Sequence, residues 1–266
     1  MALVRVSTAG RSMRLILDDP RRQNALSAEM VAEIEAALDA APHALGALVV
    51  EGAGGAFSAG ADLKALREAL AKPPSPGETD PLQALNAAGG RFFARFAALP
   101  FVTIAVVDGA AIGGGVGLAA AADVVIATAK ARFSLTETSL GFPPAQIAPH
   151  LVDRLGLRAA KRLALTGARL NGREAAAIGL ADLFCESDEE RDARLDELLK
   201  AIDRSAPNAN AETKRLFRAC GAAPTDAYIE TAARSFAASL RSDEGREGLA
   251  AFAEKRAPSW AKGSSK

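Results

Sequence analysis

Residues 109–117 form a glycine-rich turn between an extended apolar run and an alanine-rich helical segment, and this turn most constrains the fold. The apolar run, residues 101–107, is rich in β-branched side chains and is typical of a buried strand. The three consecutive glycines after it allow another group to approach the backbone closely. The first N–H groups of the helix lack internal partners and lie at the positive end of its dipole. This strand–turn–helix unit therefore predicts a site for a negatively charged oxygen.

A second unit of the same kind lies upstream, where the glycine-rich residues 52–60 follow a buried-type strand at 47–50. They precede a helical pattern over 63–70, which Asp62 is placed to cap. The later turn lacks the lysine and hydroxyl residue of a phosphate loop, and glycines alone are also compatible with close packing of a helix on a strand. Two such units can each aim a backbone N–H at one point, and two converging donors form an oxyanion hole.

The composition indicates one large α/β domain with a core built mainly of aliphatic side chains. The chain has 266 residues, of which 49% are hydrophobic but only 5% aromatic. Its 32 basic and 32 acidic residues balance, so nucleic acid is an unlikely partner. The sequence predicts no membrane span and no signal peptide, and its two cysteines suit a reduced cytoplasmic protein. The two histidines are too scattered for a metal site.

Strand and helix patterns alternate along the first part of the chain, which predicts a layered α/β core at 1–188. Strands are expected at 3–6, 14–17, 47–50, 102–107, 124–127 and 183–184, and helices between them at 28–39, 82–98 and 158–165. The strands then stop, and 189–266 is expected to form a helical C-terminal region. Its helices are predicted at 192–205, 209–220, 224–240 and 243–255.

Several motifs, taken together and in order, resemble the crotonase family of enoyl-CoA hydratases and isomerases. The most specific are residues 57–64, which read Phe-Ser-Ala-Gly-Ala-Asp-Leu-Lys, and the glycines at 113–115. Others that fit the family pattern lie at 24–27, 131–137, 165–167, 175–182 and 244–258. The resemblance covers nearly the whole chain. It implies a crotonase-like spiral of β-β-α turns, with a helical C-terminal trimerisation region.

The resemblance also implies roles for particular residues. The two oxyanion N–H donors of the family fall on Ala61 and Gly114, and one catalytic glutamate falls on Glu137. From the residues alone, Glu137 also suits a carboxylate that caps the start of a helix. The second glutamate of two-carboxylate hydratases would fall on Gly117, a vacated catalytic position. Substrate or coenzyme A contacts are expected at Arg22, Ala25, Ala59, Asp62, Leu63, Lys64, Gly113, Thr136, Gln146, Phe252 and Lys255.

The expected substrate is an acyl-CoA thioester, and no separate cofactor is expected because coenzyme A enters with the substrate. Residues 142–149 depart from the usual family pattern and resemble the branch that hydrates 3-methylglutaconyl-CoA and related branched thioesters. Hydration of an enoyl-CoA ranks first, with Gln146 hypothesised to hold the water. A single carboxylate also suffices for a 1,3-proton shift, so a Δ3,Δ2-enoyl-CoA isomerase is the alternative. A catalytically lapsed relative that binds coenzyme A or RNA is the second alternative.

The resemblance further implies a homotrimer or a dimer of trimers. Phe252 and Lys255 would then reach the coenzyme A of a neighbouring subunit, while Arg22 and Lys64 would meet its phosphates within one subunit.

Overall fold

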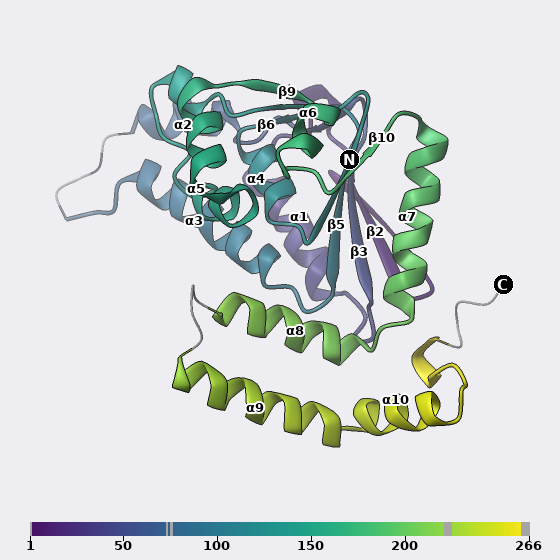
Figure 1. The fold of residues 1–266 in the computed structure, drawn as a ribbon. Coiled ribbons are helices and arrows are strands. Elements are labelled where there is room, and N and C mark those ends of the chain that lie inside the picture. The colour runs from purple at the N-terminus through teal and green to yellow at the C-terminus, as the bar shows by residue number, and fades with distance from the viewer. Residues whose placement is uncertain (1, 73, 75–76, 221–224, 262–266) are drawn as a thin grey trace.

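The chain folds around two β-sheets, as seen in a computed structural model that describes residues 2–72, 74, 77–220 and 225–261 (Figure 1). The larger sheet has six strands in the order β1 (Val4–Ala9), β2 (Ser12–Leu17), β3 (Ala47–Gly52), β5 (Val102–Val107), β7 (Val124–Thr128) and β10 (Leu183–Cys185). In this sheet β1 and β2 pair antiparallel, and the other neighbours pair parallel. Each of the six strands lies where the sequence predicts one.

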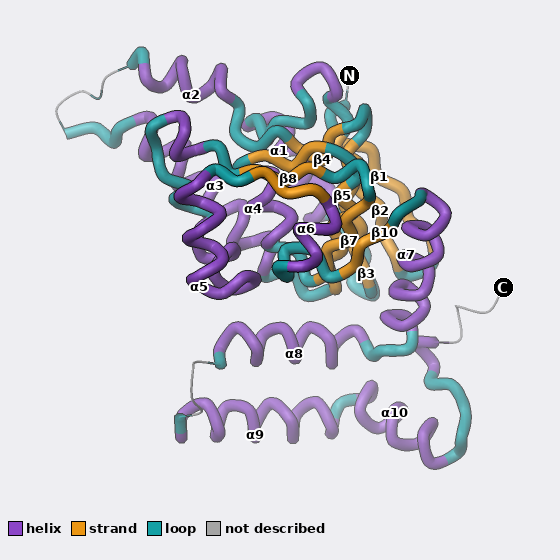
Figure 2. The backbone as a smooth tube through the Cα atoms, turned by 45° about the horizontal axis from the view of Figure 1, so that its top comes forward, coloured by secondary structure: helices purple, strands orange, loops and turns teal. Residues whose placement is uncertain are grey.

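The smaller sheet has four strands of three residues each, ordered β4 (Ala56–Ser58), β6 (Ala110–Ile112), β8 (Arg132–Ser134) and β9 (Arg169–Asn171). Hydrophobic periodicity does not predict β4, β6 or β9, because three residues are too few to show an alternating pattern. Strand β8 lies within residues 131–137, one of the ranges that resemble the family pattern. Figure 2 shows the short strands beside the longer ones, with helices outside them.

Each successive turn of the chain adds one strand to each sheet and then a helix, so the expected spiral of β-β-α turns is confirmed. The pairs β3–β4, β5–β6 and β7–β8 are followed by α2 (Leu63–Leu70) with α3 (Pro81–Ala97), by α4 (Gly114–Ala120) and by α5 (Ala148–Thr166). Helix α1 (Ala28–Asp39) precedes these turns and α6 (Gly172–Ala177) follows them. Short 3-10 helices lie at Pro20–Arg22, Glu137–Leu140 and Ser259–Ala261.

Helix α5 is longer than the predicted 158–165. It begins at Ala148 with a proline in its first turn, where the missing N–H costs nothing. Gly156 interrupts it with a positive φ of 69°, so the regular helical pattern in the sequence starts only after this residue.

The central strands of the six-stranded sheet are buried on both faces. Along β3, Leu48 and Val50 face the main core, whereas Ala47 and Val49 face a second apolar cluster on the opposite side. This alternation follows from the two-residue period of a strand. The second cluster is completed by α7 (Asp188–Asp203), which packs on β7 and β10. The predicted boundary between residues 188 and 189 therefore falls in the first turn of a helix that covers the sheet.

The remaining helices, α8 (Pro207–Ala219), α9 (Asp226–Arg241) and α10 (Asp243–Ala253), lie at one end of the molecule. In Figures 1 and 2, α8 runs beside the core, and α9 and α10 form a second row beyond it. Lys214 ties α8 to the core, because its ammonium donates to the Phe101 carbonyl at 2.9 Å and to Asp123 at 2.6 Å. Within the described residues, no helix is long and apolar enough to cross a membrane.

Candidate active site

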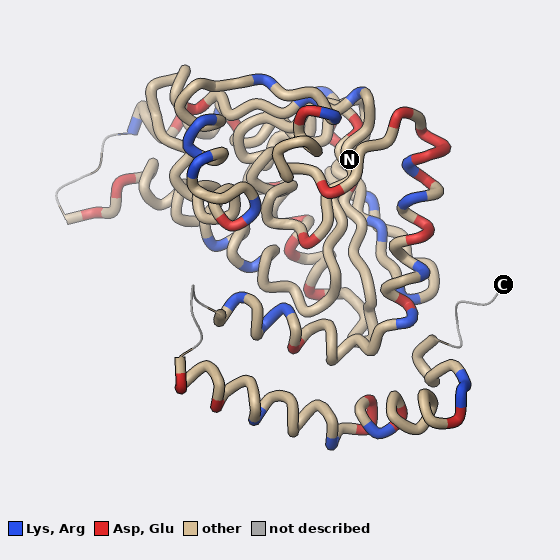
Figure 3. Tube along the Cα trace, viewed as in Figure 1, with Lys and Arg blue, Asp and Glu red and all other residues tan. Residues whose placement is uncertain are grey.

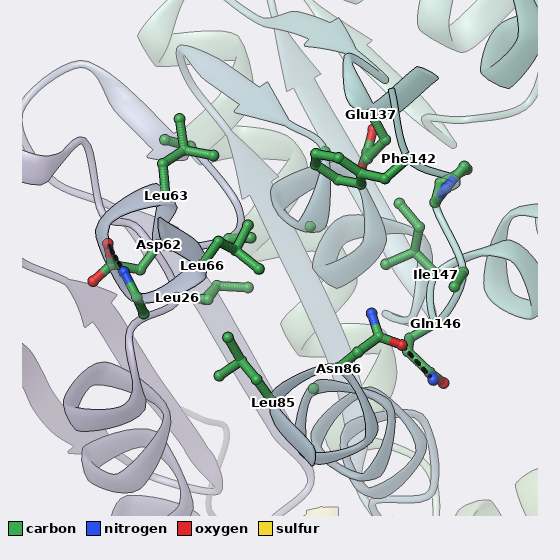
Figure 4. A pocket seen from close by; sticks show the side chains of 18 of the residues that line it. Leu26, Asp62, Leu63, Leu66, Leu85, Asn86, Glu137, Phe142, Gln146 and Ile147 are labelled. Atoms are coloured by element: carbon green, nitrogen blue, oxygen red, sulfur yellow. Dashed lines mark hydrogen bonds between the residues drawn. The ribbon is translucent and has the colours of Figure 1, made fainter. Parts of the chain in front are cut away.

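A cavity of about 470 Å³ opens between α2, α3, the start of α4 and the segment that follows β8 (Figure 4). Its walls are mostly apolar, as is usual for ligand sites of this size. The walls include Leu26, Val31, Leu66, Leu85, Phe92, Phe93, Ile112, Leu140, Phe142 and Ile147. Nine residues that the sequence proposes for the site also line it: Ala59, Ala61, Asp62, Leu63, Gly113, Gly114, Thr136, Glu137 and Gln146.

The other proposed residues do not line this cavity. Ala25 is buried in the loop before α1, and Gly117 is buried within α4. Arg22 lies near the rim, where it pairs with Asp19 and, at 3.6 Å, with Asp62. Lys64 lies in the first turn of α2, with 83% of its side chain exposed.

Phe252 and Lys255 lie in the C-terminal helical region, outside the cavity of their own chain. Phe252 is 85% exposed near the end of α10, and Lys255 follows that helix. The structure therefore does not bring these two residues together with the rest of the proposed site.

The Ala61 N–H is aimed into the cavity by its own peptide unit. The carbonyl of that unit, Gly60 O, accepts a 2.7 Å hydrogen bond from the Leu26 N–H. In a trans peptide the carbonyl and the N–H point in opposite directions, so this bond turns the Ala61 N–H away from Leu26. Among the described residues, the Ala61 N–H has no hydrogen-bond acceptor.

A buried network holds the turn that carries this donor. The Ser58 hydroxyl donates to the Asn24 carbonyl at 2.7 Å and accepts from the Gly60 N–H at 3.1 Å. The Asn24 amide donates to two carbonyls, Ala53 O at 2.9 Å and Ala56 O at 2.7 Å. Sequence analysis does not single out either side chain for this role. Their positions in the two motifs at 24–27 and 57–64 were the available signal.

The Gly114 N–H is oriented in the same way at the start of α4. The Gly113 carbonyl accepts from the Gly117 N–H at 3.1 Å, in the first bond of the helix, so the Gly114 N–H points out of the helix. Gly113 is held by its own N–H, which donates to Ser134 O at 2.9 Å, and it has a φ of 51°. The Gly114 N–H also lacks an acceptor in the described part of the chain.

The two donors lie close together because glycines allow their segments to touch. A Cβ on Gly60, whose φ is 79°, would lie 2.6 Å from the Gly114 nitrogen. A Cβ on Gly114 would lie 3.4 Å from the Ala61 nitrogen. Both unpartnered N–H groups therefore border the same small part of the cavity.

The Glu137 side chain reaches the same part of the cavity. Its Oε1 lies 2.8 Å from the point that a Cβ on Gly113 would occupy, so a side chain at 113 would displace it. Only 8% of Glu137 is exposed, and its Oε2 is buried without a hydrogen-bond partner. Burial raises the pKa of Glu137, and backbone hydrogen bonds at Glu137 and Thr136 oppose this rise less strongly. A buried carboxyl group with a raised pKa is suited to give and take protons in general acid–base catalysis.

Gly117 faces Ile147 and not open space. A Cβ on Gly117 would lie only 2.2 Å from Ile147 Cγ2 and 2.8 Å from Ile147 Cβ. Ile147 is itself buried and lines the cavity. Ile147 thus fills the space beside Gly117, where a second catalytic glutamate would lie.

We therefore expect Gly117→Glu to lower the melting temperature by several degrees and to reduce turnover of every enoyl thioester. The new side chain must displace Ile147, and overpacking of this kind costs about 1–3 kcal/mol. Thermal melting and activity of Gly117→Glu, Ile147→Ala and the double variant would check this. The double variant should regain part of the stability lost in Gly117→Glu. A Gly117→Glu protein with normal melting and faster hydration would show instead that the position is open.

The spiral of β-β-α turns, with its cavity beside the glycine turns after β4 and β6, defines a crotonase-type protein. Comparison with known proteins agrees. A family model described as enoyl-CoA hydratase/isomerase matches residues 11–263, so the chain belongs to the enoyl-CoA hydratase/isomerase family. It is an enzyme of the crotonase superfamily.

Individual relatives match over almost their whole length. The chain is 30% identical to the 2,3-dehydroadipyl-CoA hydratase of Escherichia coli, covering 95% of this chain and 96% of that protein. An enoyl-CoA hydratase/isomerase structure from Marinobacter aquaeolei matches with a TM-score of 0.92 and 38% identity, covering 98% and 99% of the two chains. Pseudomonas aeruginosa AtuE matches with a TM-score of 0.91 and 42% identity, covering 98% and 100%.

Proposed function

We propose that the protein is an enoyl-CoA hydratase that adds water across the α,β double bond of an acyl-CoA thioester. The observation that carries this proposal is the meeting of two unpartnered N–H groups, at Ala61 and Gly114, with the buried carboxyl of Glu137 in one apolar cavity. Family membership supports a hydratase or an isomerase and leaves the acyl group open.

In the proposed reaction, the thioester oxygen accepts hydrogen bonds from the Ala61 and Gly114 N–H groups. These donors stabilise the negative charge that develops on that oxygen when water adds to the β-carbon. Glu137, as a carboxylate, takes a proton from the attacking water, and the resulting carboxylic acid gives a proton to the α-carbon. One carboxyl group thus completes both transfers and returns to its starting state. No cofactor takes part, because coenzyme A belongs to the substrate.

The apolar walls support an extended or branched hydrocarbon chain. The resemblance of residues 142–149 supports the proposal of a branched acyl group of the 3-methylglutaconyl type. Because Ile147 fills the space beside Gly117, a branch would occupy the main cavity. Arg22 and Lys64, near the rim, are proposed to meet the phosphates of coenzyme A. Phe252 and Lys255 are proposed to act on a neighbouring subunit within a trimer or a dimer of trimers. Free Cys185 and Cys220 suit the proposed cytoplasmic location.

An isomerase is the second candidate, and the number of carboxyl groups favours it. Among the described residues that line the cavity, only Asp62 and Glu137 are acidic. The Asp62 carboxylate caps α2 by accepting from the Lys64 and Ala65 N–H groups, and it also lies 3.6 Å from Arg22. Glu137 alone is therefore placed to move a proton between the α and γ carbons. The charge distribution does not support a lapsed enzyme that binds RNA. Basic and acidic residues are interspersed along the chain (Figure 3), and their numbers are equal.

One spectrophotometric experiment separates these candidates. Hydration of crotonyl-CoA or 3-methylglutaconyl-CoA removes the conjugated double bond and lowers the absorbance, whereas isomerisation of 3-hexenoyl-CoA creates conjugation and raises it. We expect a fall with the first two substrates. A rise with 3-hexenoyl-CoA and no change with the others would establish the isomerase. No change with any of them, together with binding of coenzyme A, would overturn both enzyme proposals.

A further inference from the structure

Two amide side chains form a polar pair in the mostly apolar cavity, and the proposed mechanism uses neither. Gln146 Nε2 donates a 2.8 Å hydrogen bond to Asn86 Oδ1 and joins residues 60 positions apart. Both residues line the cavity. In Figure 4 the pair lies at the end of the cavity away from Glu137, and Ile147 lies between them. This position does not suit the hypothesis that Gln146 holds the water beside Glu137.

The Gln146 side chain packs against a glycine-containing part of helix α3. Its middle carries two consecutive glycines, Gly89 and Gly90, and each costs a helix interior about 1 kcal/mol relative to alanine. A Cβ on Gly90 would lie 2.3 Å from Gln146 Oε1 and 2.7 Å from its Cδ. Because Gly90 has no Cβ, the Gln146 amide can lie against the helix backbone, and a larger residue at 90 would push that amide aside.

The Gln146 amide in turn orients Asn86. Because Asn86 Oδ1 accepts from Gln146, the Asn86 Nδ2 is directed away from Gln146. Figure 4 shows that nitrogen pointing into the cavity, in the space between Leu66, Leu85 and Ile147. Within the described residues, Asn86 Nδ2 has no hydrogen-bond acceptor. Asn86 is exposed to solvent in the open cavity, so water can accept from its Nδ2 when no ligand is bound. A ligand that displaces this water keeps the hydrogen bond only if it brings an oxygen to the same place.

We infer that Asn86 Nδ2 recognises an oxygen acceptor on the acyl chain, remote from the thioester, and that Gln146 is its positioning residue. The substrate class is thus an enoyl-CoA whose acyl group carries a hydroxyl or a carboxylate. No Lys or Arg is among the described residues that line the cavity, so the oxygen would be recognised by a hydrogen bond and not by an ion pair. This inference rests on the proposed function, since it takes the cavity to hold the acyl group.

Binding of saturated acyl-CoA compounds tests the inference without requiring turnover. Calorimetry would compare straight acyl chains of six and eight carbons that end in a methyl group, a hydroxyl or a carboxylate. The proteins would be the wild type, Asn86→Leu, Asn86→Asp and the control Gln83→Leu, which changes an exposed amide of the same helix outside the cavity. We expect the wild type and Gln83→Leu to bind at least one polar-ended chain more tightly than its methyl-ended counterpart.

Asn86→Leu should reduce that preference by about three- to tenfold, as expected for a lost hydrogen bond. Asn86→Asp keeps the acceptor for Gln146 but replaces the donor with a carboxylate. It should therefore lose the carboxylate-ended chain and retain the hydroxyl-ended one, which distinguishes the two sources of the oxygen. Equal preferences in the wild type and Asn86→Leu, at both chain lengths, would overturn the inference. If the inference about Asn86 fails but crotonyl-CoA is hydrated, the proposed hydratase function still holds.

Discussion

Replacing Glu137 with glutamine should lower kcat for hydration of crotonyl-CoA by at least about a hundredfold, because general acid–base catalysis contributes about 10²–10⁴. Glutamine keeps the shape of the side chain but can neither take a proton from water nor give one to the α-carbon. KM should change little, since in the proposed complex the thioester oxygen binds to the Ala61 and Gly114 N–H groups and not to Glu137. Steady-state kinetics would check both parameters. A fall in kcat of less than about tenfold would show that another group moves the proton.

The same variant should become more stable relative to the wild type as the pH rises. Burial raises the pKa of Glu137 in the folded protein above its unfolded value, so the folded state holds the proton more tightly. The resulting stabilisation is complete below the unfolded pKa and is lost as the pH rises through the folded pKa. Glutamine does not ionise, so the melting temperature of Glu137→Gln minus that of the wild type should be larger at pH 8 than at pH 4. An equal difference at the two pH values would contradict the assigned burial effect.

The longer elements could be predicted from the sequence because they are long enough to show a period. Helix α1 and strand β5 match the expected ranges 28–39 and 102–107 residue for residue. Strands of three residues show no period, and β4 or β6 forms only because a neighbouring turn of the spiral pairs with it. The first half of α5 is not predicted for a different reason. Gly156 has a positive φ and interrupts the helical repeat of the sequence.

In the candidate site, too, local patterns predict some residues, whereas contacts between distant residues are not predicted. The glycine turns predict backbone donors, and the resemblance assigns Ala61, Gly114 and Glu137, which all line one cavity. The partners that complete the site come from distant parts of the chain. Ile147 against Gly117 and Gln146 against Asn86 are contacts across 30 and 60 residues, and no local pattern encodes them. Phe252 and Lys255 lie outside the cavity of their own chain, and the local pattern around them does not encode that separation.

Proline at position 114 should lower kcat by about 10²–10³ relative to alanine at the same position, which is the usual cost of removing one oxyanion donor. Gly114 is the first residue of α4, where proline is well tolerated because the N–H there has no helical partner. Both substitutions add a Cβ, which would lie 3.3 Å from Gly60 Cα and 3.4 Å from the Ala61 nitrogen. Only Gly114→Pro also removes the N–H.

The comparison between Gly114→Pro and Gly114→Ala therefore separates the donor from the crowding. Crowding should lower the melting temperature of both variants, whereas loss of the donor should lower kcat in Gly114→Pro far more than in Gly114→Ala. Melting curves and steady-state kinetics with crotonyl-CoA would measure the two effects independently. If the variants fold and turn over equally fast, the thioester oxygen does not bind at Gly114. Because Ala61 shares the developing charge with Gly114, Gly114→Pro should keep some residual activity that depends on Glu137.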